Sequence, residues 1–271
     1  MLPLAAYADR LSVRPGQTIT FKVANAGAGP VSARLVRVIC ADANPAGPGI
    51  QLESIDAAVT EIAQPGPCEV PAGSYAVVNG ADRFFAGPSF TLACRVFPTH
   101  VNGRRQALVA RLDTRRHLGV GLIMEEDGRL GALMGDGATL EGPTTSRRLS
   151  IRRWHVAWLR FDATTRKLEV GHAPVGIDAS DGRTADSTAC EVRDAASPAA
   201  DGPLLFAAAN HAAPEALFNG KLERPMLWDR ALSQDEMEQL VSGEEPTGAA
   251  AIWDFADGSR GSRITDAGPN A

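Results

Sequence analysis

Acidic side chains offer this chain its most obvious chemistry, but their spacing does not form a hydrolytic pair. Residues 125–127 read Glu-Glu-Asp and stand directly before Gly128, a pattern that predicts a tight turn. Glycosidases need two carboxyl groups that flank one bond, whereas consecutive side chains in a turn diverge. Glu236 and Glu238 fall on the exposed face of a predicted helix. We therefore expect no catalytic carboxylate pair.

Serine–histidine catalysis has no better support. The chain has five histidines and no G-x-S-x-G elbow. His155 lies between two apolar residues in a strand pattern, which predicts a partly buried structural side chain. The other histidines are interpreted as residues of loops or strand ends, without the H-x-x-x-H spacing of zinc ligands: His100, His117, His172 and His211. We expect no catalytic residue in this chain taken alone.

The segment 35–49 contains two candidate contacts to a ligand or a partner, Asp42 and Asn44. A β-type run, Leu35–Ile39, precedes a turn that two prolines stiffen and two glycines free. Asp42 and Asn44 can fold back onto their own backbone there, as turn residues do. We interpret the segment as the exit from an N-terminal β unit into a larger domain.

Arginine pairs are the remaining candidates for recognition. Arg152 and Arg153 could bind a carboxylate or an acidic partner surface with two hydrogen bonds each. The alternative is a solvated face, because arginine is abundant throughout: only three of the 27 basic residues are lysines. The net charge of −5 argues against nucleic acid as a partner.

Composition indicates an ordinary folded protein. Hydrophobic residues make up 44% and charged residues 22% of the chain. No apolar stretch approaches the roughly 20 residues needed to cross a bilayer, and the start of the chain lacks a basic head. We expect a cytoplasmic protein that does not bind membranes. Its four scattered cysteines are then expected as free thiols: Cys40, Cys68, Cys94 and Cys190.

Two-residue alternation predicts β-strands along most of the chain. Thr18–Val23 and Ser32–Ile39 are expected to pair as an N-terminal hairpin. From residue 74 onward, short strands bounded by turn residues favour an all-β antiparallel sandwich. These expected strands cover residues 74–78, 90–96, 106–112, 118–124, 129–135, 154–162 and 167–170.

One short helix interrupts the β pattern. Ser233 and Glu236 have the spacing of a capping box, in which each side chain accepts the other's backbone N–H. Met237 and Leu240 then form one buried stripe, and Gly243 suits the helix end.

Three of these patterns, in order, resemble a laminin G-like, concanavalin A-like jelly roll. They are two strands around a glycine turn, a tryptophan-rich hairpin, and a strand that leads into the capped helix: residues 106–135, 153–170 and 218–233. The resemblance covers roughly residues 70 to 256. It implies a fold and carries almost no information on activity.

The opening of the chain resembles the start of the large (beta) subunit of the N,N-dimethylformamidase family. The resemblance is carried by Ser12–Thr18, Leu35–Ile39 and Asp42–Gly49, with similar motifs at Gly73–Tyr75 and Trp253–Phe255. It implies two regions, namely residues 1–48 as part of a split immunoglobulin-like unit and residues 49–271 as the jelly roll.

The same resemblance implies a function. In that family an iron held by tyrosine and glutamate hydrolyses the amide in a later domain, and neither Tyr7 nor Tyr75 matches that centre. We expect a non-catalytic module that serves assembly or covers the catalytic domain. Its partners would be that domain or other subunits.

Calcium and carbohydrate are the ligands that a laminin G-like fold implies. Calcium needs several loop oxygens, and the candidates are Asp82, Asp136 and Asp162, with Asn79 and Asp257 of suitable type. No D-x-D-x-D-G spacing occurs, so these residues are alternatively turn formers. A glycan-binding module is the alternative function, although the four tryptophans fall in core-like strand patterns.

Overall fold

The chain divides into two compact units, Met1–Pro71 and Ala72–Ala271. A computed structural model describes residues 4–25, 27, 30–42, 44, 46–56, 74–85, 87–176, 185–210, 213–257 and 262–268. The predicted boundary at residues 48 and 49 differs from this division, because residues on both sides of it belong to one hairpin. The assignment of the first unit to a split immunoglobulin-like domain stays a prediction.

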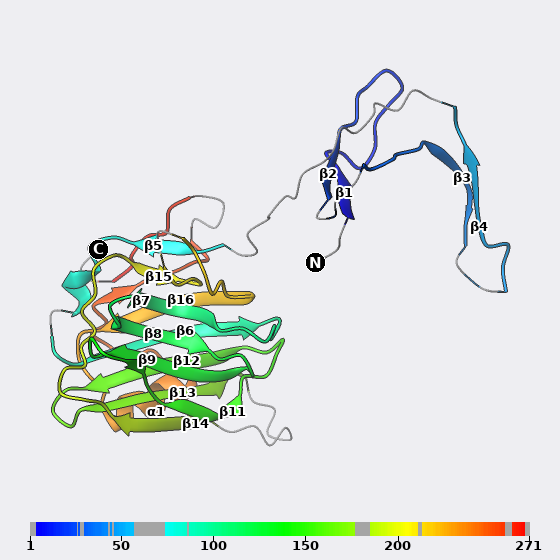
Figure 1. The fold of residues 1–271 in the computed structure, drawn as a ribbon. Coiled ribbons are helices and arrows are strands. Elements are labelled where there is room, and N and C mark those ends of the chain that lie inside the picture. Colours follow the sequence, from blue (N-terminus) through cyan, green and yellow to red (C-terminus); the bar gives the residue numbers. More distant parts are fainter. Residues whose placement is uncertain are drawn as a thin grey trace. The chain divides into compact units, whose positions relative to one another are not determined.

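The first unit contains two separate two-stranded antiparallel sheets (Figure 1). Strand β1 (Leu4–Ala8) pairs with β2 (Phe21–Asn25), and β3 (Val36–Ala41) pairs with β4 (Ile50–Ser54). The predicted pairing of Thr18–Val23 with Ser32–Ile39 is therefore wrong. The two runs overlap β2 and β3, but these strands pair with β1 and β4, which were not predicted.

The interpretation of residues 35–49 as an exit into a larger domain is also wrong. After β3 the chain turns and returns as β4, with Val36 opposite Ser54 and Ala41 opposite Ile50. A register shift between Val38 and Cys40 marks a bulge in the hairpin. The proline- and glycine-rich segment is thus a hairpin loop.

The second unit is a sandwich of two antiparallel sheets (Figure 1). The first has the order β10-β9-β8-β7-β15-β5, with β11 also paired to β9. Its strands are β5 (Ala76–Val78), β7 (Gln106–Asp113), β8 (Leu118–Met124), β9 (Arg129–Gly135), β10 (Leu140–Glu141), β11 (Thr144–Arg148) and β15 (Leu204–Phe206).

The second sheet has the order β14-β13-β12-β6-β16-β17. Its strands are β6 (Phe90–Pro98), β12 (His155–Asp162), β13 (Lys167–Pro174), β14 (Asp186–Glu191), β16 (Gly220–Trp228) and β17 (Ala251–Ile252). The all-β antiparallel sandwich predicted from the sequence is confirmed.

Alternation along each strand separates the core from the outer layer. On β12, Leu159 and Phe161 point into the core between the sheets, whereas Trp158 points outward. The inner face packs on apolar residues of the other sheet, among them Leu108 and Leu122. Because side chains alternate with period two, this burial fixes the register of the strand.

Helix α1 (Gln234–Ser242) covers the outward-facing apolar residues of the second sheet. Its buried residues Met237 and Leu240 pack in the cluster that contains Trp158. Both halves of the predicted capping box form at Ser233 and Glu236, and the helix ends at Gly243 in the left-handed conformation. No helix among the described residues is long and apolar enough to span a membrane.

Replacing Ser233 by alanine is expected to lower the free energy of unfolding by about 1 kcal/mol, because the amide of Glu236 loses the hydroxyl that caps it. Chemical denaturation followed by tryptophan fluorescence measures the change. Gln234→Ala, one residue further into the helix, is the control and should change stability by less than about 0.5 kcal/mol. Equal losses for both variants would contradict the capping role.

Candidate functional site

The three carboxylates named as calcium candidates lie in separate places. Asp82 lies on a short 3-10 helix (Ala81–Phe85) and forms an ion pair with Arg111. Asp136 accepts hydrogen bonds from the backbone of Ala138 and Thr139, at 2.8 and 2.6 Å, and these bonds lower the pKa of its carboxyl.

Asp162 has the same turn-forming role as Asp136. It accepts from the amide of Thr164 and the hydroxyl of Thr165, both at 2.9 Å. Among the described residues, no group of three or more His, Cys, Asp or Glu side chains is placed to hold a metal ion. Calcium binding stays a prediction. Asp136 and Asp162 act here as turn formers, whereas Asp82 pairs with Arg111.

Asp42 and Asn44 fold back onto their backbone as predicted. The amide of Asn44 donates to the Asp42 carboxylate at 2.8 Å, and the amide of Ala46 donates to the Asn44 side chain at 3.1 Å. Both side chains therefore shape the loop between β3 and β4. Their contact with a ligand or a partner stays a prediction.

Arg152 and Arg153 lie in the exposed turn that joins β11 to β12. The amide of Arg152 donates to the Pro98 carbonyl at 2.6 Å, and its φ of 58° places it in the left-handed region. The turn thus holds both residues beside the end of β6. Recognition of an acidic partner by these residues stays a prediction.

Two histidines form a buried pair inside one end of the sandwich. The rings of His155 and His172 lie edge to face, 5.3 Å apart, and both residues are buried. Nε2 of His155 lies 3.1 Å from the amide nitrogen of Ser150 and 3.3 Å from its carbonyl oxygen. His155 is more deeply buried than the partly buried position predicted for it, and its structural role stays a prediction. The placement of His172 at a strand end or in a loop is wrong, since it lies within β13.

A catalytic triad does not form around this pair. The hydroxyl of Ser146 donates directly to Asp186, at 3.1 Å to either oxygen. Nε2 of His172 lies 3.3 Å from the Arg147 carbonyl. Because the serine is bonded to the acid and the imidazole lies against a backbone carbonyl, His172 is not placed to take the serine proton.

The buried thiol is also unsuited to catalysis. Burial raises the pKa of Cys94 to about 12, so its reactive thiolate is scarce at neutral pH. Cys40 and Cys190 are free and partly buried, and Cys68 lies outside the described residues.

An arginine on the inner face of β7 marks the site that the sequence did not predict. Arg111 lies opposite Val120 of β8 and is 2% exposed. Its Nε donates to the Gly202 carbonyl at 3.2 Å, and its Nη2 donates to the Ala200 carbonyl at 2.5 Å and to Asp82. Asp82, by contrast, is 86% exposed at its side chain.

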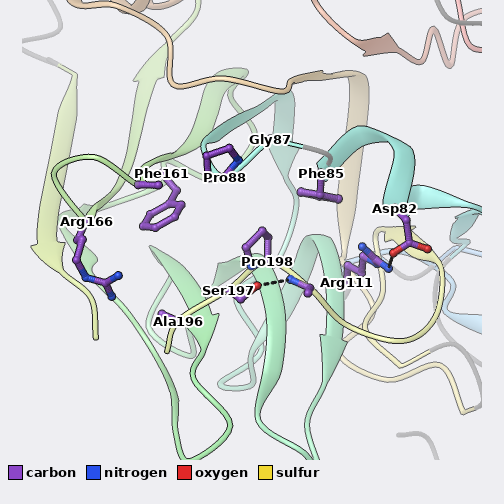
Figure 2. Close-up of a pocket in the computed structure, with 12 residues that line it drawn as sticks. Asp82, Phe85, Gly87, Pro88, Arg111, Phe161, Arg166, Ala196, Ser197 and Pro198 are labelled. Atoms are coloured by element: carbon purple, nitrogen blue, oxygen red, sulfur yellow. Dashed lines mark hydrogen bonds and ion pairs between the residues drawn. The ribbon is translucent and has the colours of Figure 1, made fainter. Parts of the chain in front are cut away.

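Arg111 lines a pocket of about 340 Å3 (Figure 2). Figure 2 shows Arg111 with Asp82 at one end and Arg166 at the other. Arg166 donates from Nε and Nη2 to the Val192 carbonyl, at 3.0 and 2.7 Å, which holds its guanidinium at the wall. The side chains between the two arginines are mostly apolar: Phe85, Pro88, Phe161, Ala163, Ala196 and Pro198.

The sequence did contain one signal for this pocket. Arg111 interrupts an apolar strand at a position whose neighbours face the core, and a charged residue there needs a partner. Its partners are distant in sequence, so the pattern did not identify them.

Nearly the whole chain is similar in sequence to one enzyme subunit. Two curated relatives are N,N-dimethylformamidase beta subunits, from Paracoccus aminophilus and from an Alcaligenes species. The first is 33% identical over 94% of this chain and the second 31% over 95%. The chain is therefore homologous to the N-terminal part of that subunit. It spans only 36% of either relative's length.

Solved structures that resemble the chain are more distant in sequence. A pentraxin from Limulus polyphemus has a TM-score of 0.43 and 14% identity, covering 59% of this chain and 72% of its own. The carbohydrate-binding module CBM40 of a Ruminococcus gnavus sialidase, bound to sialyllactose, has a TM-score of 0.48 and 15% identity, covering 60% and 86%. At this similarity the comparison concerns the fold alone. No protein-family model matches the chain.

The buried histidine pair predicts how stability changes with pH. Burial lowers the pKa of His172 below its usual 6.5, so the unfolded chain binds a proton more readily than the folded chain. Stability should therefore be constant above that value and fall as the pH drops below it, where the unfolded state is protonated first. Urea denaturation between about pH 8 and pH 5 measures this.

His172→Gln should flatten the fall in stability below pH 6.5, whatever its effect at neutral pH. His100→Gln, at an exposed position, is the control and should keep the wild-type slope. Charged groups near His172 are Asp186 and Arg147. An unchanged slope in His172→Gln would show that other groups cause the pH dependence.

Proposed function

We propose that this chain is a non-catalytic β-sandwich module of a protein similar to the N,N-dimethylformamidase beta subunit. The observation that supports this is homology along 94% of the chain, combined with coverage of only 36% of the relative. The module would serve assembly, or would cover a catalytic domain. Its partners would be that domain or other subunits of such an enzyme.

The described side chains support a non-catalytic role. The serine and histidine nearest to a catalytic arrangement are bonded to other groups. The two tyrosines belong to different compact units, Tyr7 to the first and Tyr75 to the second. Three of the four tryptophans, Trp158, Trp228 and Trp253, are buried and so cannot stack on a sugar, whereas Trp154 is partly exposed.

The first unit offers an assembly surface. On its strands Tyr7, Phe21 and Ile50 are 68%, 61% and 65% exposed, and no residue among its described ones is buried. A two-stranded hairpin is marginally stable by itself in water, and large exposed apolar side chains mark interaction sites. We expect further strands of a partner domain or subunit to cover these side chains and Leu35, which is also exposed.

The isolated chain should not hydrolyse N,N-dimethylformamide. The expected result is no release of dimethylamine above the buffer rate when the purified chain is supplied with iron. The reason is that no group of three or more His, Cys, Asp or Glu side chains among its described residues is placed to hold a metal ion. A complete N,N-dimethylformamidase assayed in parallel is the positive control. Turnover by this chain with a defined kcat would refute the non-catalytic assignment.

The exposed and the buried phenylalanines should differ sharply in their contribution to stability. Phe206 is 1% exposed and packs against Trp253 at 4.9 Å between ring centroids, so Phe206→Ala should cost about 3–5 kcal/mol. Phe21→Ala should cost less than about 0.5 kcal/mol in the isolated chain, because Phe21 is 61% exposed. Chemical denaturation measures both. A large loss for Phe21→Ala would mean that the isolated chain already covers it.

A further inference from the structure

The protein uses only part of the hydrogen-bonding capacity of the Arg111 guanidinium. Nε and Nη2 donate to two backbone carbonyls and to Asp82. Within the described part of the chain Nη1 has no hydrogen-bond partner. Nη1 is not one of the fully buried polar atoms, so water or a ligand that enters the pocket can bond to it.

The wall beside Arg111 is apolar and close. Its guanidinium carbon lies 5.6 Å from the centre of the Phe85 ring, and Phe161 and Pro198 line the pocket toward Arg166 (Figure 2). A cavity of about 340 Å3 is at the small end of ligand-binding pockets. The space therefore suits a compact apolar group attached to an acceptor for Arg111.

A carboxylate is the acceptor that fits this donor best. The planar guanidinium binds carboxylates through charge-assisted hydrogen bonds, which are about twice as strong as neutral ones. The protein already uses this chemistry at the same side chain, since Asp82 occupies Nη2 from the solvent side.

We propose that this pocket binds a small organic acid, with its carboxylate on Nη1 of Arg111 and its apolar body between Phe85, Phe161 and Pro198. This inference does not depend on the proposed assembly role, because it rests on the contacts of one pocket inside the second unit. Asp82 competes with the bound acid, because its negative charge beside Arg111 lowers the affinity of the pocket for a second carboxylate.

Benzoate is a suitable probe, and benzamide is its uncharged isostere. Titration of the full chain by calorimetry should show saturable binding of benzoate below about 10 mM and at least tenfold weaker binding of benzamide. Equal affinities for the two compounds, or no saturable binding of benzoate, would overturn the proposal.

Three variants of exposed residues locate the binding without removing the buried arginine. Asp82→Asn should tighten benzoate binding about three- to tenfold, because the competing charge is lost. Glu238→Gln removes the same charge from the exposed surface of helix α1 and should leave the affinity unchanged. Ala199→Phe should abolish binding, since Ala199 is exposed and lines the pocket. Unchanged affinity in Asp82→Asn and in Ala199→Phe would place benzoate elsewhere and overturn the proposal.

Discussion

The apolar contact between the two large sheets is the constraint on which the second unit depends. Leu159 of β12 and Leu122 of β8 belong to one buried cluster drawn from both sheets. Burying a side chain of this size is worth about 1.5–3 kcal/mol, so a one-residue slip of either strand would expose a whole row of such side chains. The strand register that this contact fixes also determines which polar side chains face the core. Arg111 faces inward because it stands opposite Val120, itself a core residue.

Strands with strong alternation could be predicted from the sequence, and weakly patterned strands could not. The runs at 90–96, 106–112 and 118–124 match β6, β7 and β8 closely, because each has a buried face. Strands β11 and β14 were missed, since they read TTSRR and DSTACE and contain few large apolar residues. In the first unit β2 and β3 were found, β1 and β4 were missed, and the predicted pairing was wrong. No buried face is present there to select a partner for each strand, so the alternation carried no pairing information.

The candidate pocket could not be predicted from the sequence, although one of its residues, Asp82, had been named. Asp82 was named as a calcium candidate for its oxygen atoms, but Arg111 bonds to Asp82 across 29 positions and to the Ala200 carbonyl across 89. Local spacing contains no trace of such contacts. What the sequence does contain is the conflict at Arg111, a charge inside an apolar strand. Such a buried charge indicates that hydrogen-bonding partners exist, and only the folded structure shows which residues they are.

The two units differ in what their folding requires. The second unit satisfies its apolar side chains internally, between its sheets and beneath helix α1. The first unit leaves Tyr7, Phe21 and Ile50 largely in contact with water. Fixing the backbone of each residue costs about 1–2 kcal/mol, and two hairpins without a core recover little of that cost. Covering those three side chains would recover several kcal/mol on the usual scale for apolar burial. We infer that order in the first unit is coupled to association, so that its stability rises with the concentration of the partner that covers it.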